Sequence, residues 1–217
     1  RIVRINSMRE KFGIDDVQAV LETNTPPPSL MMPKVRTPDE VKILDQLLTE
    51  RGHLTQLHVI IETNEGLEAA HDIAHSSPRI EALFFGGIDM AAELRCKNGW
   101  DQMLYARSRV VHAAASAGLD VIDVPYLDLA DLDGMKILAQ QAKDLGFAGK
   151  GSIHPKQIAP LNKIFTPSDE EISRARRIIK TFEDAETGLV VIDGKLIEKP
   201  VMREMYRIVS IAEKLGH

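Results

Sequence analysis

Four polar residues, each placed where an apolar run ends, recur at an almost constant interval along the N-terminal part of the chain. They are Asn6, Lys34, Glu62 and Asp89, and successive members are separated by 28, 28 and 27 residues. An interval of this size holds one strand, one helix and two short loops. The apolar runs are rich in β-branched and aromatic residues, which is typical of parallel strands buried on both faces. We therefore predict repeated strand–helix units that form a parallel sheet flanked by helices.

Six strands are expected, and the helices between them have clear start and stop signals. Thr37 and Pro38 mark one helix start, Gly118 and Gly146 mark two helix ends, and the segment that follows Glu62 predicts a single helix. The expected strands are residues 1–6, 29–34, 57–62, 82–86, 119–124 and 149–153. An eight-unit (β/α)8 TIM barrel takes about 250 residues. Six units in a chain of 217 residues indicate an α/β fold of the TIM-barrel type, with the first two βα units absent from this chain.

The strand–helix repeat stops near Pro167. The next pattern is a helix over residues 168–185, followed by a hairpin with Asp193-Gly194 at its turn and a last helix from Pro200. The predicted division is an α/β barrel over residues 1–166 and a C-terminal helix–hairpin–helix extension over residues 167–217.

The composition argues against several classes of protein. A net charge of −5 gives no electrostatic reason to expect nucleic acid or an anionic membrane as partner. No apolar stretch approaches the roughly 20 residues of a membrane helix, and no signal peptide is visible. The single Cys96 cannot form an internal disulfide, so we expect a cytoplasmic protein.

Glu62 and Asp89 are the two acidic members of the periodic set. If their strands are neighbours, the two carboxylates emerge side by side at the C-terminal edge of the sheet, where α/β proteins bind ligands. Such carboxylates repel each other unless a cation lies between them, and hard oxygen ligands favour Mg²⁺, with Mn²⁺ as a substitute. The competing interpretation is that each acid only caps the helix that follows it.

Several segments, in their order along the chain, resemble one known family. They are Val3-Arg4-Ile5-Asn6, Met32-Pro33-Lys34-Val35, Ile61-Glu62-Thr63, Phe85-Gly86-Gly87-Ile88-Asp89, residues 118–126, residues 146–150 and Ile153-His154-Pro155-Lys156-Gln157. Together they resemble the HpcH/HpaI aldolase superfamily, and within it the citrate lyase β-subunit-like branch that includes malyl-CoA and citramalyl-CoA lyases. The resemblance implies an eight-stranded barrel, whose two further N-terminal units carry an acidic motif near the site.

The resemblance also implies a set of site residues. Glu62 and Asp89 match the family's metal ligands, and Arg4 matches the arginine that contacts the substrate. Gly86 and Gly87 would let main-chain amides approach a substrate carboxylate. The alternatives are a surface charge for Arg4 and a plain tight turn for the two glycines.

Coenzyme A, as part of the substrate, requires a groove more than particular charges. By resemblance the groove runs past Lys34 and past Pro125-Tyr126, although Lys34 could equally be a solvated loop charge. His154 lies at a strand end, but the family does not use it as a metal ligand, and we expect it to make a structural hydrogen bond.

The C-terminal extension contains one departure from the family pattern. Malyl-CoA-lyase-like members carry an Asp in an Ile-Asp-x-Pro hairpin segment, which covers the site of a neighbouring subunit and supplies an acid/base group. Here Glu198 stands at that position, in Ile197-Glu198-Lys199-Pro200. The resemblance therefore implies a lid, a homotrimer or a multiple of it, and Glu198 as a catalytic residue. Its extra methylene displaces the carboxylate by roughly an ångström, which matters for near-attack geometry.

The activity expected from this resemblance is a magnesium-dependent carbon–carbon lyase. It would cleave a malyl-CoA, citramalyl-CoA or citryl-CoA type substrate to acetyl-CoA and an α-keto acid or oxaloacetate, and the same site could run the condensation or hydrolyse the thioester. One alternative is a pyruvate-type aldolase that acts on free acids without CoA. Another is a non-catalytic subunit that keeps the barrel for assembly. The sequence does not select the acyl group.

Overall fold

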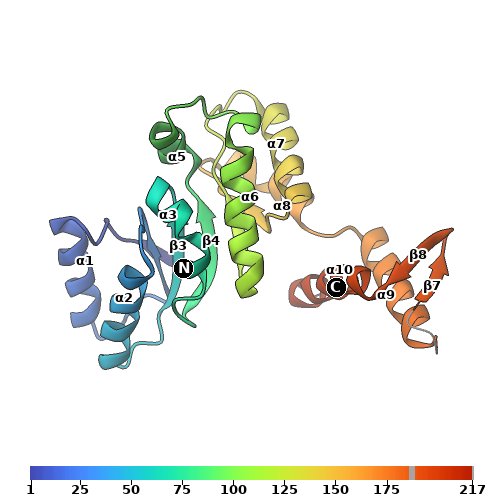
Figure 1. Cartoon of the computed structure of the whole chain (residues 1–217), viewed down its shortest axis with the longest axis horizontal. Coiled ribbons are helices and arrows are strands. Elements are labelled where there is room, and N and C mark those ends of the chain that lie inside the picture. The colour runs from blue at the N-terminus through green and yellow to red at the C-terminus, as the bar shows by residue number, and fades with distance from the viewer. Residues whose placement is uncertain (186–188, 217) are drawn as a thin grey trace. The chain divides into compact units, whose positions relative to one another are not determined.

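The computed structural model describes residues 1–185 and 189–216 (Figure 1). The chain forms two compact units, Arg1–Ile158 and Ala159–His217. The six strands of the first unit form one parallel sheet in chain order. They are β1 (Ile2–Arg4), β2 (Ser29–Met32), β3 (Gln56–Ile61), β4 (Ile80–Phe85), β5 (Asp120–Asp123) and β6 (Gly149–Lys150). The sheet curls into a half-barrel, which confirms the predicted α/β fold of the TIM-barrel type.

The register brings the C-terminal ends of the strands together along one edge. Ile61 at the end of β3 is paired with Phe85 at the end of β4, and Asp123 at the end of β5 with Lys150 in β6. Strand β6 is shorter than predicted, because the side chain of Gln157 accepts a hydrogen bond from the Ile153 amide and the chain turns away from the sheet there.

Helices connect the strands of this unit. They are α1 (Lys11–Glu22), α2 (Pro38–Glu50), α3 (Asn64–Glu68), α4 (Ala70–Ala74), α5 (Gly87–Leu94), α6 (Trp100–Ala117) and α7 (Leu132–Leu145), and α8 (Pro155–Phe165) follows β6 and continues past Ile158. Helix α6 contacts β4 and β5 (Figure 1). The predicted signals are confirmed: Thr37 and Glu40 form a capping box on α2, and Gly118 and Gly146 end α6 and α7 with φ of 71° and 114°.

The single helix predicted after Glu62 is wrong, because two short helices, α3 and α4, occupy that segment. The guanidinium of Arg109 in α6 donates hydrogen bonds to the carbonyls of Leu67 and Glu68, at 2.9 Å each. These carbonyls belong to the last turn of α3. Because Arg109 of α6 pairs with these carbonyls, the helix can end at Ala69 without leaving them unpaired.

The second unit packs a hairpin on two helices. Its elements are α9 (Asp169–Glu183), β7 (Leu189–Ile192), β8 (Lys195–Glu198) and α10 (Lys199–Leu215). Its core contains Ala175, Ile178, Ile197, Met202 and Met205. Asp193 and Gly194 turn the hairpin with φ of 51° and 73°, as the Asp-Gly pair predicts. Among residues 1–185 and 189–216, no helix is long and apolar enough to cross a membrane.

Candidate functional site

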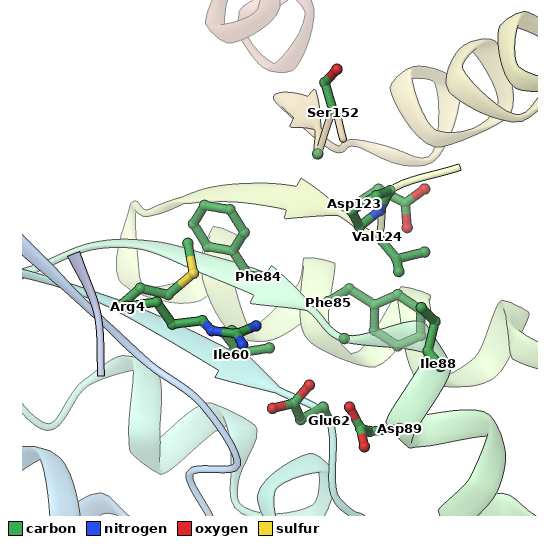
Figure 2. Close-up of a pocket in the computed structure, with 14 residues that line it drawn as sticks. Arg4, Ile60, Glu62, Phe84, Phe85, Ile88, Asp89, Asp123, Val124 and Ser152 are labelled. Carbon is green, nitrogen blue, oxygen red and sulfur yellow. The ribbon is translucent and has the colours of Figure 1, made fainter. Parts of the chain in front are cut away.

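A cavity of about 400 Å³ opens at the C-terminal edge of the parallel sheet (Figure 2). Its lining residues are Arg4, Met31, Ile60, Glu62, Phe84, Phe85, Gly86, Ile88, Asp89, Asp123, Val124, Pro125, Gly151 and Ser152. Five predicted site residues are therefore brought together: Arg4, Glu62, Gly86, Asp89 and Pro125. Gly87, Lys34 and Tyr126 are outside the lining, and Glu198 belongs to the second unit.

Glu62 follows β3 directly and its residue is only 7% exposed. Its Oε1 accepts a hydrogen bond from the main-chain amide of Lys34, at 2.9 Å. Burial, and then the negative charge of Asp89, raise the pKa of Glu62 to about 7, although the Lys34 amide acts in the opposite direction. The cap of α3 is Thr63, whose hydroxyl accepts from the Gly66 amide at 3.0 Å. Glu62 is therefore not explained as a helix cap.

Asp89 reaches the site from a different element than predicted. Strand β4 ends at Phe85, and Asp89 lies in the first turn of α5, where its charge also suits the helix dipole. In Figure 2 the side chains of Glu62 and Asp89 lie next to each other at the cavity. The Nζ of Lys34 lies 4.0 Å from Oδ1 of Asp89.

Glycine is required at residue 86 by the close approach of Glu62. A Cβ on Gly86 would overlap the Cβ and Oε2 of Glu62. A Cβ on Gly87 would instead meet the Phe85 ring at 2.9 Å and Val124 at 3.1 Å, so Gly87 lets α5 pack on the sheet. The predicted contact of these amides with a carboxylate stays a prediction.

Arg4 lies at the end of β1, on an exposed strand. Its side chain extends over the sheet toward Ile60 and Glu62 (Figure 2). A guanidinium at this position faces the side of the cavity on which the carboxylates lie, and it could contact an anionic group bound between them.

The loop after β5 is held by two hydrogen bonds. The hydroxyl of Tyr126 donates to Asp131 at 2.6 Å, which raises the pKa of Tyr126 to about 12, and the Tyr126 carbonyl accepts from Gln157 at 2.8 Å. His154 accepts a hydrogen bond at Nδ1 from the Lys156 amide, at 3.2 Å, which confirms the structural role expected for it.

A buried charged cluster, whose central residue Asp123 lines the cavity, was missed by the sequence analysis. Asp123 accepts hydrogen bonds from Arg107 Nε at 3.1 Å and from Lys150 Nζ at 2.5 Å. The Arg107 guanidinium also lies 4.9 Å from the centre of the Phe85 ring and 4.9 Å from that of Trp100. Burial lowers the pKa of Lys150, although Asp123 opposes the shift. Asp123 stands at a strand end and could have been considered, but Arg107 in the middle of a helix carries no such signal.

The residues present fit a magnesium-like ion. In the described part of the chain, no group of three His, Cys, Asp or Glu residues could hold a metal. Glu62 and Asp89 would therefore supply two carboxylate ligands, and water and substrate would supply the rest. Mg²⁺ is commonly held in this way, because it keeps several of its waters.

The sequence is similar to one family over most of the first unit. The family described as HpcH/HpaI aldolase/citrate lyase matches residues 1–155. A mitochondrial citramalyl-CoA lyase of Mus musculus is 32% identical in an alignment of 234 positions that covers 99% of this chain and 69% of that protein. An L-malyl-CoA/β-methylmalyl-CoA lyase of Rhodobacter capsulatus is 32% identical in an alignment of 240 positions that covers 97% of this chain and 76% of that relative.

Solved structures share the fold. A citrate lyase of Burkholderia xenovorans aligns with a TM-score of 0.86 and 23% identity, over 99% of this chain and 73% of that one. CitE of Mycobacterium tuberculosis, in complex with magnesium, acetoacetate and coenzyme A, aligns with a TM-score of 0.79 and 26% identity, over 98% of this chain and 78% of that one. RipC of Yersinia pestis aligns with a TM-score of 0.76 and 38% identity, over 79% of each chain.

Proposed function

Because this chain belongs to the HpcH/HpaI aldolase/citrate lyase family, we propose that it is a magnesium-dependent lyase that cleaves a 3-hydroxyacyl-CoA to acetyl-CoA and an α-keto acid. Relatives named as citramalyl-CoA and malyl-CoA lyases support the reaction class. The M. tuberculosis complex supports magnesium as the metal and coenzyme A as part of the substrate. The observation that carries the proposal is the convergence of Glu62 and Asp89 in the cavity, with the pKa of Glu62 raised to about 7.

The carboxylates and Arg4 would hold the keto-acid half of the substrate. When bound by Glu62 and Asp89, the ion supplies a Lewis acid for the carboxylate and adjacent oxygen of that half. The Arg4 guanidinium would donate hydrogen bonds to the same oxygens as their negative charge develops. Arg4 ends β1, Glu62 follows β3 and Asp89 lies in the first turn of α5, so regular elements hold all three side chains in place.

Cleavage of the bond between C2 and C3 begins with transfer of the C3 hydroxyl proton to a carboxylate base, and Glu198 is the candidate for this base. The electrons of that O–H bond form the keto carbonyl, and those of the C2–C3 bond pass to the thioester as an enolate. The apolar wall formed by Ile60, Phe84 and Ile88 would keep water away from the enolate. Protonation at C2 then gives acetyl-CoA, and this step requires an acid.

We assign that proton transfer to Glu198. In the β7–β8 hairpin Glu198 is paired with Leu189, so both side chains lie on one face, and Val191 and Leu196 share that face. Leu189, Val191 and Leu196 are 53%, 70% and 55% exposed. An acid on an exposed apolar face is suited to cover the cavity of a neighbouring subunit, and a homo-oligomer, a trimer by family resemblance, belongs to the proposal.

The other acid of the hairpin, Asp193, is a poorer candidate. Its Oδ2 accepts a hydrogen bond from Arg177, at 2.5 Å, so its charge is already paired at the turn. The Glu198 side chain does not cap α10, although Glu198 is the N-cap residue.

The experiment that tests the function is a panel of substrates. Malyl-CoA, citramalyl-CoA and citryl-CoA, and the matching free acids, are each incubated with protein and Mg²⁺, and acetyl-CoA and keto acid are quantified. We expect cleavage of at least one CoA ester and of no free acid. Turnover of free acids alone would favour a pyruvate-type aldolase. Binding of Mg²⁺ and acetyl-CoA without any turnover would favour a non-catalytic subunit.

A further inference from the structure

Lys34 occupies a backbone conformation that lysine rarely adopts. Its φ is +53°, in the left-handed region that glycine and asparagine tolerate best. A residue other than glycine in this conformation indicates that the surrounding structure holds the loop in place.

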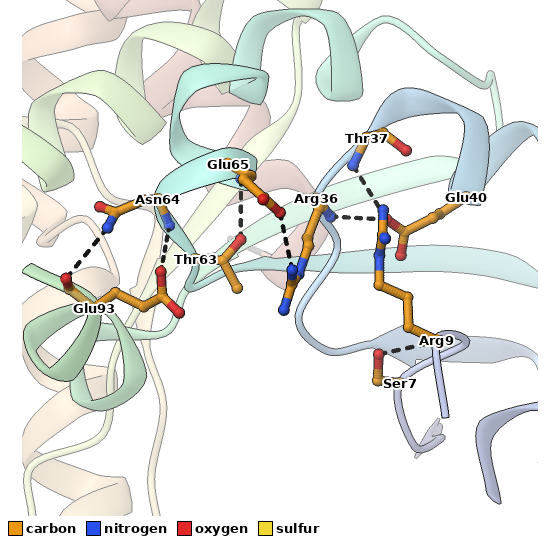
Figure 3. Close-up of polar contacts among 10 residues, drawn as sticks. Ser7, Arg9, Arg36, Thr37, Glu40, Thr63, Asn64, Glu65 and Glu93 are labelled. Atoms are coloured by element: carbon orange, nitrogen blue, oxygen red, sulfur yellow. Dashed lines mark hydrogen bonds and ion pairs between the residues drawn. The ribbon is translucent and has the colours of Figure 1, made fainter. Parts of the chain in front are cut away.

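The loop that carries Lys34 is braced from two directions (Figure 3). Oε1 of Glu40 accepts hydrogen bonds from the amides of Arg36 and Thr37, at 3.1 and 3.2 Å, and from Nη2 of Arg9 at 2.8 Å. On the other side, a Cβ on Gly66 would overlap the Val35 carbonyl, so α3 approaches the loop as closely as glycine permits. The Lys34 amide is therefore fixed before any ligand binds.

The Asp89 side of the site is braced in the same way. Asn64, the first residue of α3, donates from its main-chain amide to Oε2 of Glu93 and from its side chain to the Glu93 carbonyl, at 3.2 Å each (Figure 3). Glu93 belongs to α5, the helix that begins near Asp89. The segments that carry Glu62 and Asp89 are thus tied to each other.

Lys34 makes one contact with each carboxylate, and the two contacts differ in kind. Its amide donates to Oε1 of buried Glu62 at 2.9 Å. Its ammonium lies 4.0 Å from Oδ1 of Asp89, and these two side chains are 48% and 53% exposed. An exposed ion pair at this distance is weak and is readily exchanged.

We propose that Lys34 is a counter-ion built into the carboxylate site: its amide orients Glu62, and its ammonium balances Asp89 until a divalent ion replaces it. The inference deepens the proposed function and rests on the proposed metal site. With one oxygen of Glu62 held by the amide, the other, which lies beside Gly86, is left for the ion. The ammonium then competes with the ion for Asp89, so removal of the ammonium should strengthen metal binding.

The test compares divalent-ion affinity in Lys34→Met and the wild type. Lys34→Met keeps the amide, a Cβ and an unbranched chain but removes the charge. We expect it to bind Mg²⁺ about three- to tenfold more tightly by isothermal titration calorimetry, because a unit charge a few ångströms away acts with about this strength near water. Mn²⁺ binding measured by electron paramagnetic resonance should change in parallel. Lys34→Gln serves as a second neutral variant if Lys34→Met does not fold.

Lys42→Met is the matched control. Lys42 lies on the exposed side of α2, 3.5 Å from Asp39, and its removal changes the net charge of the protein by the same amount. Equal changes of Mg²⁺ affinity in Lys34→Met and Lys42→Met would overturn the inference, and so would unchanged or weaker Mg²⁺ binding in Lys34→Met. Neither result would contradict the metal site itself, provided that the wild type binds Mg²⁺. If neither the wild type nor the neutral variants bound the ion, the proposed metal site itself would fail, and this inference with it.

Discussion

At the scale of single residues, Glu62 is expected to make the stability of the metal-free protein depend on pH. Its ordinary pKa is 4.5 and its pKa in the fold is about 7. Below pH 4.5 it is protonated in both states. Between pH 4.5 and 7 only the unfolded chain loses the proton, so the free energy of unfolding should fall by about 3 kcal/mol as pH rises through this window.

Urea unfolding with a chelator present, at a series of pH values, measures this fall. In Glu62→Gln the contribution should disappear, and in Asp89→Asn it should shrink because one cause of the shift is removed. Parallel pH profiles for the wild type and Glu62→Gln would show that Glu62 has an ordinary pKa.

Arg4→Lys should lower kcat/KM strongly, by about 10²-fold, although the charge is kept. An ammonium cannot reproduce the two parallel hydrogen bonds of a guanidinium with a carboxylate. Steady-state kinetics with Arg51→Lys, on the exposed end of α2, as control would measure the effect. Wild-type kinetics in Arg4→Lys would place Arg4 away from the reacting atoms.

Individual residues of the site were predictable where they end a strand or begin the next helix. Glu62 and Asp89 belong to a regular spacing, so a parallel sheet brings them together whatever the details of the loops. The Asp123 cluster was not predictable, because its cations come from α6 and β6 and only packing selects them. Lys34 was predicted as either a CoA contact or a solvated loop charge, whereas its positive φ and its contacts with both carboxylates follow from the folded loop.

At the scale of elements, the turn from β4 into α5 leaves no room for a side chain beside Glu62. Gly86→Ala would press a Cβ against that carboxylate, and we expect a loss of stability of about 1–3 kcal/mol together with weaker Mg²⁺ binding. Gly87→Ala should lower stability by pressing on Phe85 and Val124, with a smaller effect on the metal. Chemical denaturation and calorimetry would separate the two, and equal metal affinities in both variants would contradict this account of Gly86.

The order and type of the strands followed from the sequence, but some helix boundaries did not. Spacing and caps are local signals, and they predicted the sheet and the helix start at Thr37. The break at Ala69 depends on Arg109, which is 42 residues from Leu67 along the chain. The sequence of α3 and α4 alone therefore does not predict the contact with Arg109.

At the scale of the whole molecule, Glu198 is expected to act across a subunit boundary. Glu198→Gln should slow the chemical step by about 10²- to 10⁴-fold, and leave the Mg²⁺ affinity unchanged. Glu198→Asp, which restores the residue expected from the family pattern, should retain much of the activity.

Mixed oligomers of Glu198→Gln and Glu62→Gln subunits should regain activity, because some interfaces combine an intact hairpin with an intact cavity. Absence of rescue in verified mixed oligomers would assign the hairpin to its own subunit, and an unchanged rate in Glu198→Gln would remove Glu198 from the mechanism.

The central claim is that Glu62 and Asp89 hold the ion on which lyase activity depends. The most direct measurement is the turnover of the preferred CoA ester at saturating Mg²⁺ by the wild type, Glu62→Gln and Asp89→Asn, each corrected for its folded fraction. Both variants should fold, because each removes one of two carboxylate charges that repel each other in the metal-free site. Both should lose most of the activity and the calorimetric signal of Mg²⁺ binding. Full activity per folded molecule in either variant, with unchanged Mg²⁺ affinity, would contradict the claim.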